Sequence, residues 1–168
     1  MAKPIMNQGV TMINNDVRGA RTEILSPDLR IHWYEPGDEQ WWIEIHELAN
    51  HHNEITPKLF SNQFTHVELN LSNRQCYLLD RHGHAIATGT AWAESQGRFA
   101  GYGRLHWVAV VPAFQNRGIG TMLVSILCQQ LIALGYICAF LTTSSDRSAA
   151  IHVYEKFGFR IDGDDERR

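Results

Sequence analysis

The sequence has few cysteines, and their spacing excludes the usual cysteine motifs. The chain has 168 residues with three cysteines, Cys76, Cys128 and Cys138, none in a CxxC pair. An odd number of cysteines in apolar stretches argues against a disulfide framework and indicates buried thiols in a reducing compartment. We therefore expect a cytoplasmic protein.

Excess charge and long apolar runs are also missing. There are 15 Lys and Arg against 18 Asp and Glu, for a formal net charge of −3, and no sustained basic run. This balance argues against nucleic acid as a partner. No segment reaches the roughly 18 apolar residues of a membrane span, and the N-terminus lacks the apolar core of a signal peptide. We expect no membrane partner.

What is present is the composition of one folded domain. Hydrophobic residues make up 44% of the chain and charged residues 20%, and a chain of this length buries about 70% of its unfolded surface. Residues 1–28 lack periodicity and are predicted to be an irregular N-terminal arm, followed by a single domain over 29–168.

Apolar periodicity predicts an α/β domain, a mixed sheet flanked by helices in the order β-α-α-β-β-β-α-β-α-β. Period-2 and β-branched runs indicate strands, and apolar residues at helical spacing indicate helices. We expect strands over 29–34, 75–80, 85–94, 104–111, 136–141 and 159–161, and helices over 38–52, 56–64, 119–134 and 148–157. The run 136–141 is apolar throughout, as in a strand buried on both faces.

The segment that carries chemistry is the turn between the strand 104–111 and the long helix. Gly118 and Gly120 allow close backbone approach, and the unpaired amides at the helix start favour an anion such as a pyrophosphate. Arg117 could add a charged contact. The letters fit neither a Walker A loop, which needs a Lys, nor a dinucleotide fingerprint, which needs a third Gly where Leu123 stands. A merely flexible loop remains the alternative.

Two motifs in this region resemble those of the GNAT superfamily of acyl-CoA-dependent N-acyltransferases. The first is Val108-Ala-Val110 followed by Gln115-Asn-Arg-Gly-Ile-Gly120, and the second is the ending Tyr154-Glu-Lys-Phe-Gly-Phe159. The resemblance implies transfer of an acetyl group from acetyl-CoA, the co-substrate, directly to an amine. It also implies that the donor binds along Val108, Ala109, Val110, Gln115, Asn116, Arg117, Gly118, Ile119, Gly120 and Thr121.

The resemblance also implies catalytic roles. Tyr154 lies where many members place the acid that protonates the departing CoA thiolate, although a core tyrosine gives the same letter. His106, two residues before Val108 and so expected on the same strand face, is a candidate base with an ordinary pKa near 6.5. Glu94 is the second candidate base. The Val108 amide is the expected donor to the developing oxyanion.

The sequence departs from the family at two places. Arg147 stands where many members have an Asn that contacts the pantetheine. Only seven residues follow Ile161, so the last strand of the usual fold is short, absent, or supplied by the N-terminal arm or a partner chain.

The acceptor is less defined. The resemblance places its wall on the first two helices and the loop before the strand 104–111, where an aromatic lining would favour an apolar or aromatic small-molecule amine; a protein amine stays open. These residues are Trp41, Trp42, His46, Phe60, Phe64 and 99–102.

Three further questions concern partners, metals and catalysis. Many family members dimerise, which makes a homodimer an expectation. His46 and His51 resemble a metalloprotease HExxH motif but are one residue too far apart to share a helix face, so we expect no metal. The alternative function is a non-catalytic acyl-CoA sensor or interaction module on the same fold.

Overall fold

The computed structural model describes residues 8–50, 52–64 and 69–163. Its strands are β1 (Gly9–Asn14), β2 (Arg30–Trp33), β3 (Gln75–Leu79), β4 (Ala85–Ala93), β5 (Gly103–Val110), β6 (Ala139–Ser144) and β7 (Arg160–Ile161). Its α-helices are α1 (Glu39–Ala49), α2 (Pro57–Gln63), α3 (Ile119–Ala133) and α4 (Ser148–Lys156). Most of the predicted elements are confirmed within a few residues.

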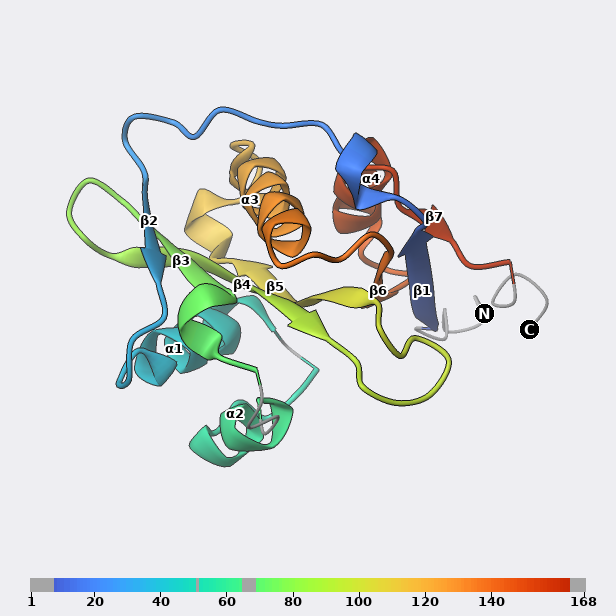
Figure 1. The fold of residues 1–168 in the computed structure, drawn as a ribbon. Helices are drawn as coiled ribbons and strands as arrows, with labels where there is room; N and C mark the ends of the chain where they lie inside the picture. Colours follow the sequence, from blue (N-terminus) through green and yellow to red (C-terminus); the bar gives the residue numbers. More distant parts are fainter. Residues whose placement is uncertain (1–7, 51, 65–68, 164–168) are drawn as a thin grey trace, which may run out of the picture.

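The strands form one mixed sheet in the order β2-β3-β4-β5-β6-β1-β7, in which only the β5–β6 pair is parallel. Figure 1 shows α3 and α4 on one face of the sheet and α1 and α2 on the other. The predicted α/β class with a helix-flanked mixed sheet is therefore confirmed. No helix within the described residues is long and apolar enough to cross a membrane.

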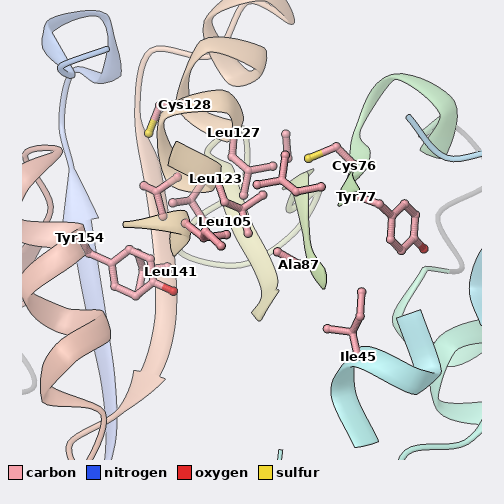
Figure 2. Close-up of a cluster of buried hydrophobic side chains, with 14 of the residues drawn as sticks. Ile45, Cys76, Tyr77, Ala87, Leu105, Leu123, Leu127, Cys128, Leu141 and Tyr154 are labelled. Atoms are coloured by element: carbon pink, nitrogen blue, oxygen red, sulfur yellow. The ribbon is translucent and has the colours of Figure 1, made fainter. Parts of the chain in front are cut away.

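Helix α3 lies against the centre of the sheet because two strand glycines leave room for its leucines. A Cβ added to Gly89 of β4 would lie 2.6 Å from Cδ1 of Leu127, and one added to Gly103 of β5 would lie 2.7 Å from Cδ2 of Leu131. The four-residue spacing of these leucines places them on one face of the helix. Figure 2 shows this buried cluster between helix and strands. These contacts hold α3 against β4 and β5, and the glycine turn joins β5 to the start of this helix.

The prediction that residues 1–28 form an irregular arm is wrong for residues 9–14. This segment is β1, which pairs antiparallel with β6 from Gly9↔Ser144 to Asn14↔Ala139 and with β7 at Met12↔Ile161. Of the alternatives left open for the short C-terminal end, the structure therefore shows an N-terminal strand that completes the sheet. The part of the arm before residue 8 lies outside the described residues.

The strand predicted over 136–141 is shifted. β6 begins at Ala139 and continues through polar residues to Ser144. Residues 136–138 instead connect α3 to the sheet: the Ile137 carbonyl accepts a hydrogen bond from Val17 N and the Cys138 carbonyl one from Gly103 N. Ile137 is 48% exposed, so its apolar side chain does not mark a buried strand. Hydrophobicity alone could not locate the start of this strand.

Candidate active site

The two parallel strands at the centre of the sheet separate almost as soon as they meet. β5 and β6 pair only at Gly103↔Ala139 and Arg104↔Phe140, although β5 runs on to Val110 and β6 to Ser144. A cavity of about 870 Å³ opens where they diverge. Its walls come from β5, β6, the end of α1, the glycine turn and α4, and they include His46, His106, Trp107, Val108, Gly120, Thr142, Arg147 and Tyr154.

A β-bulge in β5 determines which side chains face this cavity. The register with β4 passes from Thr88↔Ala109 to Thr90↔His106, which leaves one extra residue on β5, and Trp107 adopts a left-handed φ of 51°. The extra residue interrupts the alternation of faces.

The prediction that His106 and Val108 share a strand face is therefore wrong. Val108 lies on the α3 face of the sheet, where its Cγ2 is 3.5 Å from a Cβ added to Gly89. The centroid of the His106 ring lies 5.6 Å from that of Phe64, the C-cap residue of α2. Helix α2 covers the face of the sheet opposite α3 (Figure 1). The bulge separates the two residues.

The environment of His106 also differs from the expected one. The side chain is 6% exposed and lies parallel to Trp92, with ring centroids 6.4 Å apart. Burial lowers its pKa from 6.5 to about 3, and the positive charge of Arg104 acts in the same direction. The expected pKa near 6.5 is therefore wrong, because an imidazole without access to water loses the hydration of its charged form. His106 is neutral at physiological pH.

The glycine turn after β5 contains two residues in the left-handed conformation. Asn116 has φ 61° and Gly118 has φ 77°, and the first α-helical hydrogen bond of α3 runs from Met122 N to the Gly118 carbonyl. The amides of 119–121 precede that bond and have no partner within the helix. Gly120 and Thr121 line the cavity, and a Cβ on Gly120 would meet only Val110, at 3.9 Å.

Of two other residues predicted to bind the donor, Gln115 lines the cavity and Arg117 does not. The Gln115 side-chain amide donates a 3.0 Å hydrogen bond to the Val110 carbonyl, at the strand end near the turn. The Arg117 guanidinium lies 5.2 Å from the centre of the Phe114 ring, and Arg117 lines a separate, smaller depression rather than the cavity. Gln115 therefore binds the backbone at the end of β5, beside the cavity, while Arg117 lies outside the cavity lining.

Tyr154 lines the cavity from α4, as its place in the second motif predicts. Figure 2 shows its ring extending away from α4 with the hydroxyl at the far end. Burial raises the pKa of this phenol to about 12, and the nearby Arg147 charge opposes the shift. Tyr154 therefore keeps its proton at neutral pH and can donate it.

Glu94, the second candidate base, is engaged outside the cavity. Its Oε1 accepts a 2.6 Å hydrogen bond from Nη1 of Arg104, whose other terminal nitrogen donates to Thr142 on β6. Glu94 is not among the residues that line the cavity. Its hydrogen bond with Arg104 instead joins the end of β4 to the start of β5, at the last residue of β5 that pairs with β6.

Most of the predicted aromatic wall does not line the cavity. Phe60, Phe64 and Trp42 pack on one another, with ring centroids 4.8 to 5.9 Å apart, and the Phe99 ring lies 4.2 Å from that of Phe140. Of the predicted wall only His46 lines the cavity. Arg147, which stands where many family members have an Asn, also lines the cavity. Further polar lining residues that the sequence did not predict are Asn50, Asn53, Gln63, Arg104, Thr142, Thr143 and Ser144.

The cysteines do not contribute a nucleophile to this cavity. None of the three lines it, and burial raises the pKa of both Cys76 and Cys128 to about 12. The Cys138 Sγ donates to the Asn15 carbonyl. Among the described residues no group of three His, Cys, Asp or Glu is placed to hold a metal ion; His51 lies outside them.

Comparison with known proteins gives one consistent relationship. Residues 29–159 match the model of the Acetyltransferase (GNAT) family. A mycothiol acetyltransferase of Streptomyces griseus is 26% identical over 162 residues, which are 95% of this chain and 46% of that protein. The crystal structure of a GCN5-related N-acetyltransferase from Sphaerobacter thermophilus superposes with a TM-score of 0.77 at 17% identity, over 93% of this chain and 49% of the other.

The ribosomal-protein-S18-alanine N-acetyltransferase from Escherichia coli superposes with a TM-score of 0.64 at 22% identity, over 79% of this chain and 77% of that one. These two structural likenesses show the shared fold. The chain spans about half the length of the Streptomyces and Sphaerobacter proteins.

Proposed function

The chain belongs to the GNAT acetyltransferase family, and from this premise we propose that it transfers an acetyl group from acetyl-CoA directly to the amine of a polar small molecule. The observation that carries the proposal is the divergence of β5 and β6 around a cavity that Tyr154 and the glycine turn both line. Such a gap gives a thioester access to the centre of the sheet.

The residues around the turn fit the donor. Acetyl-CoA supplies an activated thioester, and the free amides of 119–121 at the start of α3 suit its pyrophosphate. Beyond Arg104, no strand of the described residues pairs with β5 on its β6 side, so its backbone is available to an extended ligand arm in the manner of an added strand. The open space beside Gly120 fits close approach of a ligand to the backbone.

The chemistry that the proposal gives to this chain is proton donation and charge stabilisation. Tyr154 donates its proton to the sulfur that leaves, which suits a phenol that is still protonated at neutral pH. The Val108 amide donates to the oxygen on which negative charge develops. The proposal does not assign the base role to Glu94, which is bound to Arg104 and does not line the cavity. It does not assign that role to His106 either, whose pKa of about 3 makes it a weaker base than His46, with a pKa of about 4.

The polar lining supports a polar acceptor. The amides of Asn50 and Asn53, the hydroxyls of Thr142 and Thr143 and the Arg147 guanidinium offer both donors and acceptors. A polar acceptor can exchange hydrogen bonds with these side chains, whereas the aromatic part of an aromatic amine cannot. We therefore expect an acceptor that carries hydroxyl, amide or carboxylate groups beside its amine.

The test is release of the CoA thiol from acetyl-CoA in the presence of single amines. Glucosamine, alanine amide, a tripeptide amide with an N-terminal alanine, and 2-phenylethylamine cover the polar, peptide and aromatic classes. We expect a small polar amine to be used at least about tenfold more efficiently than 2-phenylethylamine. A preference for 2-phenylethylamine contradicts the polar-acceptor assignment, and no turnover with any amine contradicts the proposed activity.

A further inference from the structure

A buried histidine on the cavity wall, His46, belongs neither to the glycine turn nor to the helix that carries Tyr154. His46 lies in the last turn of α1 and lines the cavity, yet its side chain is only 2% exposed. Among the residues that the structure describes, none is a hydrogen-bond partner of its Nε2. An unsatisfied buried polar atom is costly in a folded protein, so one on a cavity wall indicates a group that receives a ligand.

The His46 ring is held firmly in place. Its centroid lies 4.5 Å from that of Trp42, one turn earlier on α1, and 5.1 Å from that of Trp107, at an interplanar angle of 86° to the latter. Trp107 is the residue at the β5 bulge, and its indole Nε1 donates a 3.0 Å hydrogen bond to Oε1 of Gln63 at the end of α2. Two indoles from different elements therefore orient the imidazole.

The hydrogen bonding of the ring selects its tautomer. A backbone hydrogen bond with Trp107 acts on the pKa of His46. Because Nε2 has no partner among the described residues, we assign this bond to Nδ1, as the donor to the Trp107 carbonyl. Nε2 of the neutral ring then carries the lone pair. Burial and the positive charge of Arg147 lower the pKa of His46 to about 4. His46 in turn contributes to the lowered pKa of His106. The ring is neutral, and its buried Nε2 is a hydrogen-bond acceptor.

We infer that Nε2 of His46 accepts the hydrogen bond, and then the proton, of the acceptor amine as its nitrogen bonds to the acetyl carbon. This inference rests on the proposed function. The new C–N bond forms from the amine lone pair and the C–S bond breaks with its electron pair on sulfur. Tyr154 supplies the proton to that sulfur and His46 takes the proton lost by nitrogen. Proton transfer from His46 to the Tyr154 phenolate through solvent restores both groups.

The fold places these two groups on opposite walls. α1, which carries His46, covers one face of the sheet, and α4, which carries Tyr154, lies on the other (Figure 1). Arg147 lowers the pKa of both residues, and all three line the same cavity. A proton acceptor and a proton donor on opposite sides of the gap match a reaction in which the amine enters from one side and the thiol leaves on the other.

Two replacements of His46 test this role. His46→Phe keeps a flat ring between the indoles but has no acceptor atom, whereas His46→Gln keeps a polar acceptor of similar reach. With the best amine of the panel, we expect kcat of His46→Phe to fall by about a hundredfold and that of His46→Gln to fall clearly less. Acetyl-CoA should raise the unfolding temperature of both variants as it does for the wild type. Glu47→Gln, an exposed neighbour on α1, is the control and should keep wild-type turnover.

Unchanged kcat in His46→Phe overturns the inference, and so do equal losses in the two variants or a loss of acetyl-CoA stabilisation, which would show a structural role. Nitrogen NMR of the histidine rings measures the protonation state and the tautomer of His46 and does not require turnover. At pH 7 we expect a neutral ring with its proton on Nδ1, and a charged ring or a proton on Nε2 overturns the assignment. If the wild type uses no amine while this NMR result holds, the proposed function fails and the His46 tautomer stands.

Discussion

Met12 of β1 lies opposite Leu141 of β6 across their antiparallel pairing, and neither side chain is more than 1% exposed. The pair joins the N-terminal segment to the strand that forms one side of the cavity. β1 is therefore part of the sheet that supports the site, and residues 9–14 contribute to the core.

Met12→Ala should destabilise the protein by about 2–5 kcal/mol, because it removes a fully buried side chain and leaves a cavity beneath β6. Urea unfolding followed by circular dichroism measures the change. Ile24→Ala, at a side chain that is 92% exposed, is the control and should alter stability by less than about 0.5 kcal/mol. Equal effects of the two replacements would show that β1 does not stabilise the sheet.

Local patterns in the sequence predicted the elements that depend on local interactions. The long helix follows from the spacing of Leu123, Leu127 and Leu131, and the glycine turn from Gly118, whose φ of 77° other residues adopt at a cost. β1 could not be predicted in this way, because it is held by partners more than a hundred residues away, such as Leu141. Strand pairing over that distance leaves no periodic signal in a segment of six residues.

The site was predicted in part for a related reason. Motif spacing identified Tyr154 and the glycine turn, which line the cavity. The bulge at Trp107 could not be predicted, because the sequence of the strand contains no residue pattern that marks it. One extra residue nevertheless reverses the face to which every later side chain points. The prediction of an aromatic wall was wrong because the sequence does not show whether Phe60 and Phe64 pack in the core or face a ligand.

The two buried histidines predict a pH dependence of stability. His106 and His46 have folded-state pKa values of about 3 and about 4, lowered mainly by burial and also by nearby Arg104 and Arg147. The unfolded chain binds protons near pH 6.5 and the folded protein does not, so the free energy of unfolding falls as pH drops below about 6.5. The fall approaches about 1.4 kcal/mol per pH unit for each group.

Urea unfolding at pH 7.5, 6 and 5 measures this dependence. We expect stability to be highest at pH 7.5, and the decline to be smaller in His106→Phe than in the wild type, because the variant lacks one proton-binding site in its unfolded chain. His152→Phe, at an exposed histidine on α4, should decline as the wild type does. Parallel curves for wild type and His106→Phe would refute the neutral, buried state of His106.

Replacement of glycines should separate ligand binding from folding. Gly120→Ala places a methyl group where only Val110 is near, at 3.9 Å, so the unfolding temperature without ligand should change little. The methyl group would obstruct a ligand that approaches the backbone, and the stabilisation by acetyl-CoA should fall. Gly83→Ala, at a hairpin glycine with φ 82°, should lose about 1 kcal/mol of stability and keep the acetyl-CoA effect. Full acetyl-CoA stabilisation of Gly120→Ala argues against donor binding at the turn.

Tyr154→Phe should lower kcat by about a hundredfold or more with acetyl-CoA affinity nearly unchanged, because the ring still fills its place while the proton donor is lost. Initial rates of thiol release measure kcat. Tyr136→Phe, outside the cavity lining, is the matched control and should keep its turnover. Wild-type rates in Tyr154→Phe would remove Tyr154 as the acid, and binding of acetyl-CoA without any turnover in the wild type would favour a non-catalytic sensor.

The most direct test of the central claim, that the gap between β5 and β6 binds acetyl-CoA, is thermal unfolding with and without acetyl-CoA, with NAD at equal concentration as the control. Ligand at about 100 times its dissociation constant adds about 2.7 kcal/mol of stability, which raises the unfolding temperature by several degrees. The account predicts this shift with acetyl-CoA and none with NAD. No shift at millimolar acetyl-CoA, or an equal shift with NAD, would contradict it.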